Sequence, residues 1–149
     1  KESTNLVSDP NYSYDSQYIT MLKTIKNENP NTKFIIYTSA VTSDLFVSII
    51  KNANRWEEYK KWLNELIEVF GEVNHFMYIN SVTKNLDNYY DDNHAYPFAL
   101  KFIANKLSNT NNAEIPEDFG VLLTKSNIDE YLESIKKDVE DYKFDDYLK

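Results

Sequence analysis

The chain contains no cysteine and only two glycines, Gly71 and Gly120, among its 149 residues. Without cysteine it can form neither disulfides nor thiolate metal sites. The two glycines lie far apart, which excludes a glycine-rich phosphate loop and the nucleotide-binding folds that depend on one. We therefore expect no cofactor and no bound metal.

Long apolar runs and an excess of positive charge are also missing. No run approaches the ~20 apolar residues that a membrane-spanning helix needs. Lysine and arginine number 16 against 24 aspartates and glutamates, so the formal net charge is −8. This sign argues against nucleic acid as a partner, because phosphate binding needs a basic surface.

The chain begins at Lys1 and shows no signal peptide, so we expect any targeting segment to lie upstream. The compartment stays open, with a bacterial periplasm or cell surface as one option. A hydrophobic content of 42% and an aromatic content of 15% support a folded core rather than general disorder. The length suits one domain, and we predict that residues 1–149 form a single domain or the C-terminal part of one.

A strand, a helix and a second strand are predicted in the middle of the chain. Residues 33–38 are a nearly continuous β-branched and aromatic run, typical of a strand covered on both faces. Residues 54–71 have helical spacing, with Asn54 as the expected N-cap and Gly71 at the end. Residues 76–79 are the second expected strand. A βαβ unit has parallel strands, so the predicted fold class is α/β, part of a three-layer α/β/α, flavodoxin-like domain with a parallel sheet.

Further elements flank this unit. Helices are expected near residues 15–27, 97–107 and 127–142, and residues 121–123 are an extra strand or an extended packing segment. Two strands do not make an independent parallel sheet that is covered on both faces. We therefore expect an upstream segment of the same protein, or another chain, to complete the sheet. Residues 108–149 are predicted to be a C-terminal extension with a long helix.

Candidate catalytic residues lie in the loop that precedes the helix at Pro97. Asp91 stands three residues before His94 in the run Tyr-Asp-Asp-Asn-His. A carboxylate can orient an imidazole, which can then act as a general base. Asp92 is an adjacent alternative for the orienting role. Because D-x-x-H is a short pattern, an exposed polar loop is the competing interpretation.

Other side chains are interpreted as structural. His75 lacks companions at metal-ligand spacing, and Ser39 and Ser43 are expected to be connector or cap residues. The aspartates near His94 lack the twelve-residue calcium loop and its central glycine. Trp56 and Trp62 fall on the apolar stripe of their helix, which favours core packing over sugar stacking.

Residues 14–107 resemble the C-terminal half of an SGNH/GDSL-type hydrolase-like protein. Residues 29–39 are similar to the penultimate strand of that fold, residues 62–80 to its last helix and strand, and residues 90–94 to its terminal D-x-x-H block. The resemblance implies that His94 deprotonates a serine while Asp91 holds the imidazole. The family's nucleophile lies in an N-terminal G-D-S block, and neither that block nor the central oxyanion residues occur here.

The resemblance implies ester hydrolysis or acyl transfer on an O-acyl group of a carbohydrate or lipid. The nucleophile would come from upstream, so this chain alone is predicted to be an inactive fragment of a serine esterase. The alternative is a non-catalytic binding or assembly module of the same α/β fold. In that case some of the twelve tyrosines line a binding surface.

Overall fold

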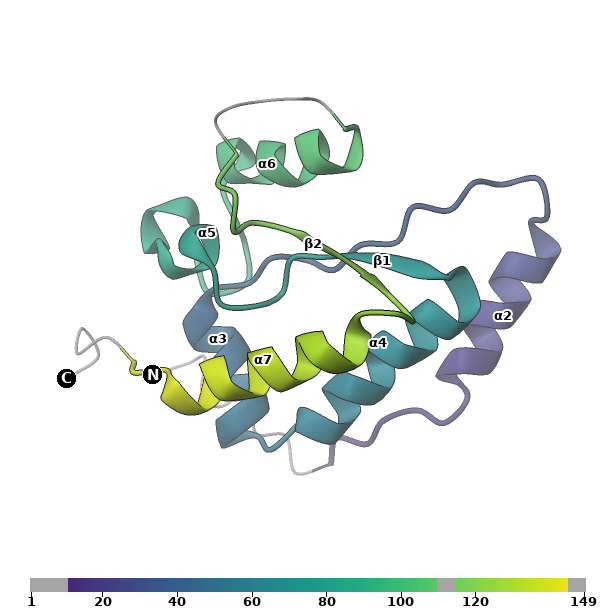
Figure 1. The fold of residues 1–149 in the computed structure, drawn as a ribbon, viewed down its shortest axis with the longest axis horizontal. Coiled ribbons are helices and arrows are strands. Elements are labelled where there is room, and N and C mark those ends of the chain that lie inside the picture. Colours follow the sequence, from purple (N-terminus) through teal and green to yellow (C-terminus); the bar gives the residue numbers. More distant parts are fainter. Residues whose placement is uncertain (1–10, 110–114, 145–149) are drawn as a thin grey trace.

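The structure is a computed structural model that describes residues 11–109 and 115–144, so parts of the predicted ranges 1–149 and 108–149 lie outside the described residues. The elements follow one another along the chain as shown in Figure 1: α2 (Tyr18–Glu28), α3 (Ser43–Val47), the π-helix η1 (Ser48–Asn52), α4 (Trp56–Phe70), β1 (Glu72–His75), α5 (Ser81–Lys84), the 3₁₀-helix η2 (Leu86–Asn88), α6 (Pro97–Leu107), β2 (Val121–Thr124) and α7 (Ile128–Asp141).

The sheet consists of β1 and β2, which pair in the antiparallel sense with Val73 opposite Leu123. Because side chains alternate between the two faces of a strand, both of these residues point to the same face. They are fully buried there, in a core that also contains Leu63 of α4 and Leu132 of α7. The two long helices therefore cover one face of the sheet (Figure 1).

The predicted parallel sheet is wrong for the part of the chain that the structure describes. Residues 33–38 form no strand, and their backbone pairing with β1 is limited to one isolated parallel bridge, between Tyr37 and Asn74. The second strand also lies four residues earlier than predicted, at 72–75 instead of 76–79. The observed architecture is mixed α/β with a small antiparallel sheet, which overturns the flavodoxin-like prediction.

The physical reason lies in the partners of the β-branched run. Such a run favours extended backbone, but it does not determine which segment pairs with it. Ile35 and Tyr37 are 52% and 53% exposed, so the run is not covered on both faces. The antiparallel partner of β1 comes instead from residues 121–124, which the sequence indicated only as an extra strand or packing segment.

The helices lie close to their predicted ranges. Gly71 ends α4 as predicted, with φ +90° in the left-handed region that glycine tolerates. The predicted N-cap is wrong, because α4 begins at Trp56 behind Arg55, and no side chain caps it. No helix in the described ranges combines the length and apolarity that a membrane crossing demands.

A second, smaller core supports α6, and through it the loop that carries Asp91 and His94. Pro97 opens this helix as expected. Ala99 and Ile103 are its buried residues, whereas Leu100 is exposed. The smaller core is made up of Ala40, Phe76, Val82, Ile103 and Phe119.

Candidate acid–base site

The loop between η2 and α6 is a short hairpin whose tip carries the two predicted site residues. Tyr89 and Ala95 form an isolated antiparallel bridge at its base. The backbone N–H of Tyr90 donates to the carbonyl oxygen of His94 over 2.8 Å. Asp91 and His94 therefore lie in a tight turn whose ends are joined.

Two contacts hold this hairpin against the connector that leads into α3. The hydroxyl of the buried Tyr89 donates to the carbonyl oxygen of Val41 over 3.4 Å. The backbone N–H of Thr42 donates to the carbonyl oxygen of Asp92 over 3.0 Å. Sequence analysis missed both anchors. A tyrosine at position 89 gives only a weak sequence signal for such a contact. A backbone hydrogen bond between remote residues gives no sequence signal at all.

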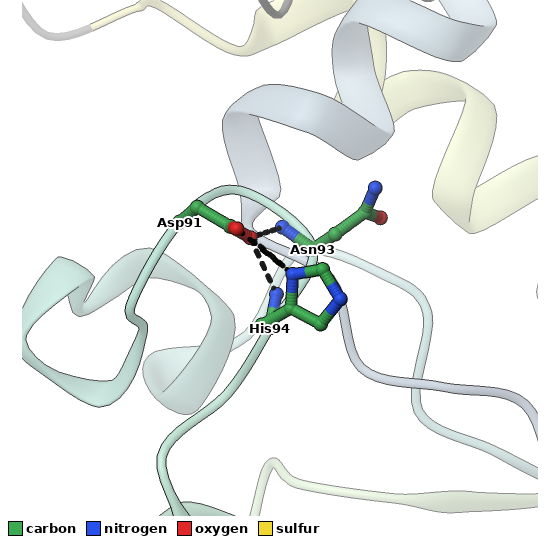
Figure 2. A network of polar contacts seen from close by, with 3 residues as sticks. All are labelled: Asp91, Asn93 and His94. Carbon is green, nitrogen blue, oxygen red and sulfur yellow. Dashed lines mark hydrogen bonds and ion pairs between the residues drawn. The ribbon is translucent and has the colours of Figure 1, made fainter.

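The carboxylate of Asp91 holds the imidazole of His94 in a fixed orientation (Figure 2). Oδ1 and Oδ2 of Asp91 each lie 2.8 Å from Nδ1 of His94. Oδ1 also accepts the backbone N–H groups of Asn93 and His94, both at 2.8 Å. The backbone of the turn thus positions the carboxylate independently of the His94 ring. The structure brings Asp91 and His94 together as the spacing predicted.

These contacts determine which ring nitrogen is basic. An ionised carboxylate can only accept hydrogen bonds, so Nδ1 of His94 carries the proton and the neutral ring keeps its lone pair on Nε2. Hydrogen bonds from the His94 side chain and from the backbone of Asn93 hold the pKa of Asp91 below its usual value. The carboxylate is therefore ionised at neutral pH, and Nε2 is available to accept a proton.

The site has a base but no nucleophile among the described residues. The His94 side chain is 75% exposed and that of Asp91 is 49% exposed. In the described ranges both side-chain hydrogen bonds of His94 are made by Nδ1, and no hydroxyl is hydrogen-bonded to Nε2. Ser43 is buried and its Oγ bonds Oγ1 of Thr83 at 2.8 Å, so it faces away from this role.

The dyad lies exposed on the surface. A pocket elsewhere on the molecule contains neither Asp91 nor His94; it is lined by Ile79, Lys84, Asp138, Asp141, Tyr142 and Lys143. The side chain of Asp92, the alternative orienting residue, makes no hydrogen bond to the ring, and only its carbonyl oxygen is used. The local geometry therefore favours Asp91 over Asp92.

The other histidine is buried and fully bonded. Nδ1 of His75 lies 3.0 Å from Oγ1 of Thr38, and Nε2 lies 2.7 Å from the hydroxyl of Tyr59. Oγ1 of Thr38 already accepts the backbone N–H groups of Phe76 and Met77. Both lone pairs of the Thr38 hydroxyl are therefore used, so this hydroxyl donates its proton to Nδ1 of His75. Nε2–H of His75 then donates to the hydroxyl of Tyr59.

Burial lowers the pKa of His75 to about 3, so this ring is neutral at physiological pH. This environment agrees with the structural role expected for it. Across the described residues, no group of three or more histidine, aspartate or glutamate side chains is arranged to hold a metal ion.

No family model, curated protein or solved structure was found to match this chain. The comparisons therefore link it to no SGNH/GDSL hydrolase, and that resemblance stays a proposal. What can be said of function depends on the geometry of the Asp91–His94 pair.

Proposed function

We propose that Asp91 and His94 are the acid–base half of a serine-hydrolase-like site, with the chemistry of SGNH/GDSL esterases. The observation that supports this is the contact of both Asp91 oxygens with Nδ1 of His94, which leaves Nε2 unbonded and basic. A ring held in this way is suited to removing a proton from a hydroxyl group.

In the proposed reaction, Nε2 of His94 accepts the proton of a serine hydroxyl as its oxygen attacks the acyl carbonyl of an ester. The ester C–O bond then breaks, and the departing alcohol takes the proton from the imidazolium. Water, deprotonated by the same nitrogen, attacks the acyl-enzyme and releases the acid and the serine. An acceptor alcohol in place of water makes the reaction an acyl transfer. We propose an O-acyl group of a carbohydrate or lipid as the substrate.

The serine comes from outside this sequence, from an upstream segment of the same protein or from another chain. The basis for this is the resemblance, because the family's G-D-S nucleophile block does not occur in this sequence. The 149-residue chain alone is therefore proposed to be inactive. Asp91 and His94 would become a working site only when the missing segment is present.

A second candidate function is a non-catalytic binding or assembly module. Three exposed aromatic side chains lie in the hairpin or just after it: Tyr90, Tyr96 and Phe98. The rings of Tyr96 and Phe98 are nearly parallel, with an interplanar angle of 15° and centroids 6.0 Å apart. Exposed aromatic groups of this kind are typical of interaction surfaces, and they favour binding without requiring chemistry.

An esterase assay on the full gene product distinguishes the two functions. With p-nitrophenyl acetate as substrate, His94→Ala is expected to lose about 10²–10⁴-fold in kcat/KM, the usual contribution of a general base. Asn93→Ala is the matched control, because it shortens a neighbouring side chain and keeps the backbone N–H that Asp91 accepts. Equal turnover by wild type and His94→Ala would refute the hydrolase and favour the binding module.

A further inference from the structure

The hairpin that carries Asp91 and His94 has a buried face and an exposed face. The bridge between Tyr89 and Ala95 closes its base, and the side chain of Tyr89 is buried. Side chains alternate between the two faces of a strand, so the neighbours of these two residues point the other way. Tyr90 and His94 are such neighbours, and a backbone hydrogen bond pairs them. The imidazole and the ring of Tyr90 therefore share the exposed face, with Cβ atoms roughly 5 Å apart for residues paired in this way.

Two further aromatic rings extend this exposed face. Tyr96 follows His94 by two residues and therefore lies on the same face of the hairpin. Its ring meets that of Tyr90 edge-on, with centroids 6.3 Å apart and an interplanar angle of 90°. It also stacks against the ring of Phe98. We call Tyr90, Tyr96 and Phe98 the aromatic face; these side chains are 77%, 39% and 50% exposed, so ring surface is accessible beside the candidate base.

The charge around the aromatic face has one sign. Residues 85–98 contain three aspartates, Asp87, Asp91 and Asp92, and neither lysine nor arginine. The face of an aromatic ring is itself negative, because its π electrons lie above and below the ring plane. Carboxylates and ring faces thus act in the same direction. They repel an anionic ligand and attract a cationic one.

No cation of the chain itself covers these rings. Elsewhere a lysine or arginine lies over an aromatic ring, with its cationic group 4.2 to 6.0 Å from the ring centroid, at each of four places: Tyr12, Tyr14, Trp56 and Phe70. Within residues 11–109 and 115–144, no lysine or arginine lies over a ring of the aromatic face. The aromatic face therefore has the charge pattern that suits a cation, and its surface is left for a cation from outside the chain.

The exposure of the rings determines which cation they suit. A primary ammonium group is strongly hydrated, and it leaves water only where a close carboxylate replaces that water. The nearest carboxylate in the turn, that of Asp91, is already bonded to His94 through both oxygens. A quaternary ammonium group has no N–H, and its methyl groups carry part of the positive charge. It is therefore less strongly hydrated and binds ring faces directly.

We infer that the aromatic face binds a trimethylammonium group, and that the ester cleaved beside it carries such a group on its alcohol part. The statement about the ester rests on the proposed function, whereas the binding of the cation does not. With the cation on Tyr90 and Tyr96, the ester carbonyl extends toward His94 on the same face of the hairpin. Among the proposed substrates, this favours a lipid ester with a quaternary ammonium group over a carbohydrate ester.

A titration of the 149-residue chain, followed by NMR, tests the binding without requiring catalysis. Acetylcholine is the cationic probe, and neohexyl acetate is its uncharged isostere, with carbon in place of nitrogen. The ring resonances of the aromatic face should shift and saturate with acetylcholine. The affinity for acetylcholine should exceed that for neohexyl acetate about threefold or more. Equal affinities overturn the inference. Tighter binding of methyl glucoside at the same rings overturns it in favour of a sugar.

Variants at one ring identify the binding surface. Tyr96→Leu removes the ring that contacts both others, and it should weaken the binding of acetylcholine about threefold or more. Tyr96→Phe keeps the ring and should retain the affinity of the wild type. Tyr37→Leu is the matched control, because it removes another exposed tyrosine outside the hairpin. Equal affinity in Tyr96→Leu and Tyr37→Leu overturns the inference.

Esterase assays on the full gene product separate this inference from the proposed function. The kcat/KM for acetylcholine should exceed that for neohexyl acetate about threefold or more, and Tyr96→Leu should remove this preference. Turnover that depends on His94 but shows no preference for the cationic ester overturns the inference alone. Binding of acetylcholine to a protein whose His94→Ala variant keeps full esterase activity would refute the proposed function and leave the cation site intact.

Discussion

The backbone N–H of Thr42 donates to the carbonyl oxygen of Asp92 over 3.0 Å, joining the connector before α3 to the hairpin that holds His94. Oγ1 of Thr42 also caps α3 by accepting the N–H of Leu45. One residue thus supports a helix with its side chain and the candidate site with its backbone.

Two variants at Thr42 separate these roles. Thr42→Ala should cost about 1 kcal/mol of stability through the lost cap. Thr42→Pro should cost about 1 kcal/mol more, because it also removes the N–H that Asp92 accepts, while the native φ of −59° suits proline. Urea denaturation measures both values. Amide exchange of His94 should speed up only in the proline variant; an equal effect in both would contradict the anchoring role.

The titration of Asp91 tests its contact with His94. The pKa of Asp91 lies below its usual value because the His94 side chain donates a hydrogen bond to it, supported by the Asn93 backbone. His94→Ala should therefore raise this pKa toward that of an ordinary aspartate, and Asn93→Ala should leave it in place. Carboxyl chemical shifts followed by NMR between about pH 2 and 6 give the midpoints.

The lowered pKa of Asp91 determines how its contribution to stability depends on pH. A carboxyl whose folded pKa is depressed stabilises the folded state above its unfolded pKa. That stabilisation is lost as the pH falls through the folded pKa. The order of the turn at Asp91 should accordingly decrease only in acid. Loss of order near neutral pH would contradict the assignment.

The contact between Asp91 and His94 could be predicted because it is local. Three residues of separation in a polar turn bring a short carboxylate to an imidazole with few competing arrangements. Gly71 at the end of α4 was predictable for a similar reason, since the helix end and the glycine are adjacent in the chain.

The sheet could not be predicted because its pairings are remote. The same β-branched run at 33–38 suits a full parallel strand or a single bridge, and only the segment on its other side decides between them. The exposure of His94 has the same origin. A loop sequence determines its own turn, but what covers that loop depends on other parts of the protein.

Burial of His75 predicts a dependence of stability on pH. Its pKa is about 3 in the folded state, against 6.5 for the unfolded side chain. Between these values the unfolded state binds more protons, so stability is full above about pH 6.5 and decreases as the pH falls. The slope reaches about 1.4 kcal/mol per pH unit. Urea denaturation of wild type and His75→Gln, compared pH by pH, isolates this slope from that of the carboxylates. If the free energy of unfolding changed with pH in the same way in both proteins, the assignment of this slope to His75 would be wrong.

The two glycines offer a matched test of packing in the smaller core. Both have positive φ, +90° at Gly71 and +84° at Gly120. A Cβ at Gly71 would meet nothing within 4 Å, whereas one at Gly120 would lie 2.5 Å from Cε1 of the buried Phe76. Gly71→Ala should therefore cost about 1 kcal/mol from backbone strain alone, and Gly120→Ala about 2–4 kcal/mol.

A smaller side chain at position 76 should reduce the cost of Gly120→Ala, because the added Cβ clashes with the side chain of Phe76. In the background of Phe76→Leu, the penalty of Gly120→Ala should fall toward that of Gly71→Ala, which gives a coupling energy of about 1 kcal/mol or more in a double-mutant cycle. The free energies come from urea denaturation. Additive effects of the two substitutions would mean that Phe76 does not restrict position 120, and that strain in the backbone accounts for the whole penalty.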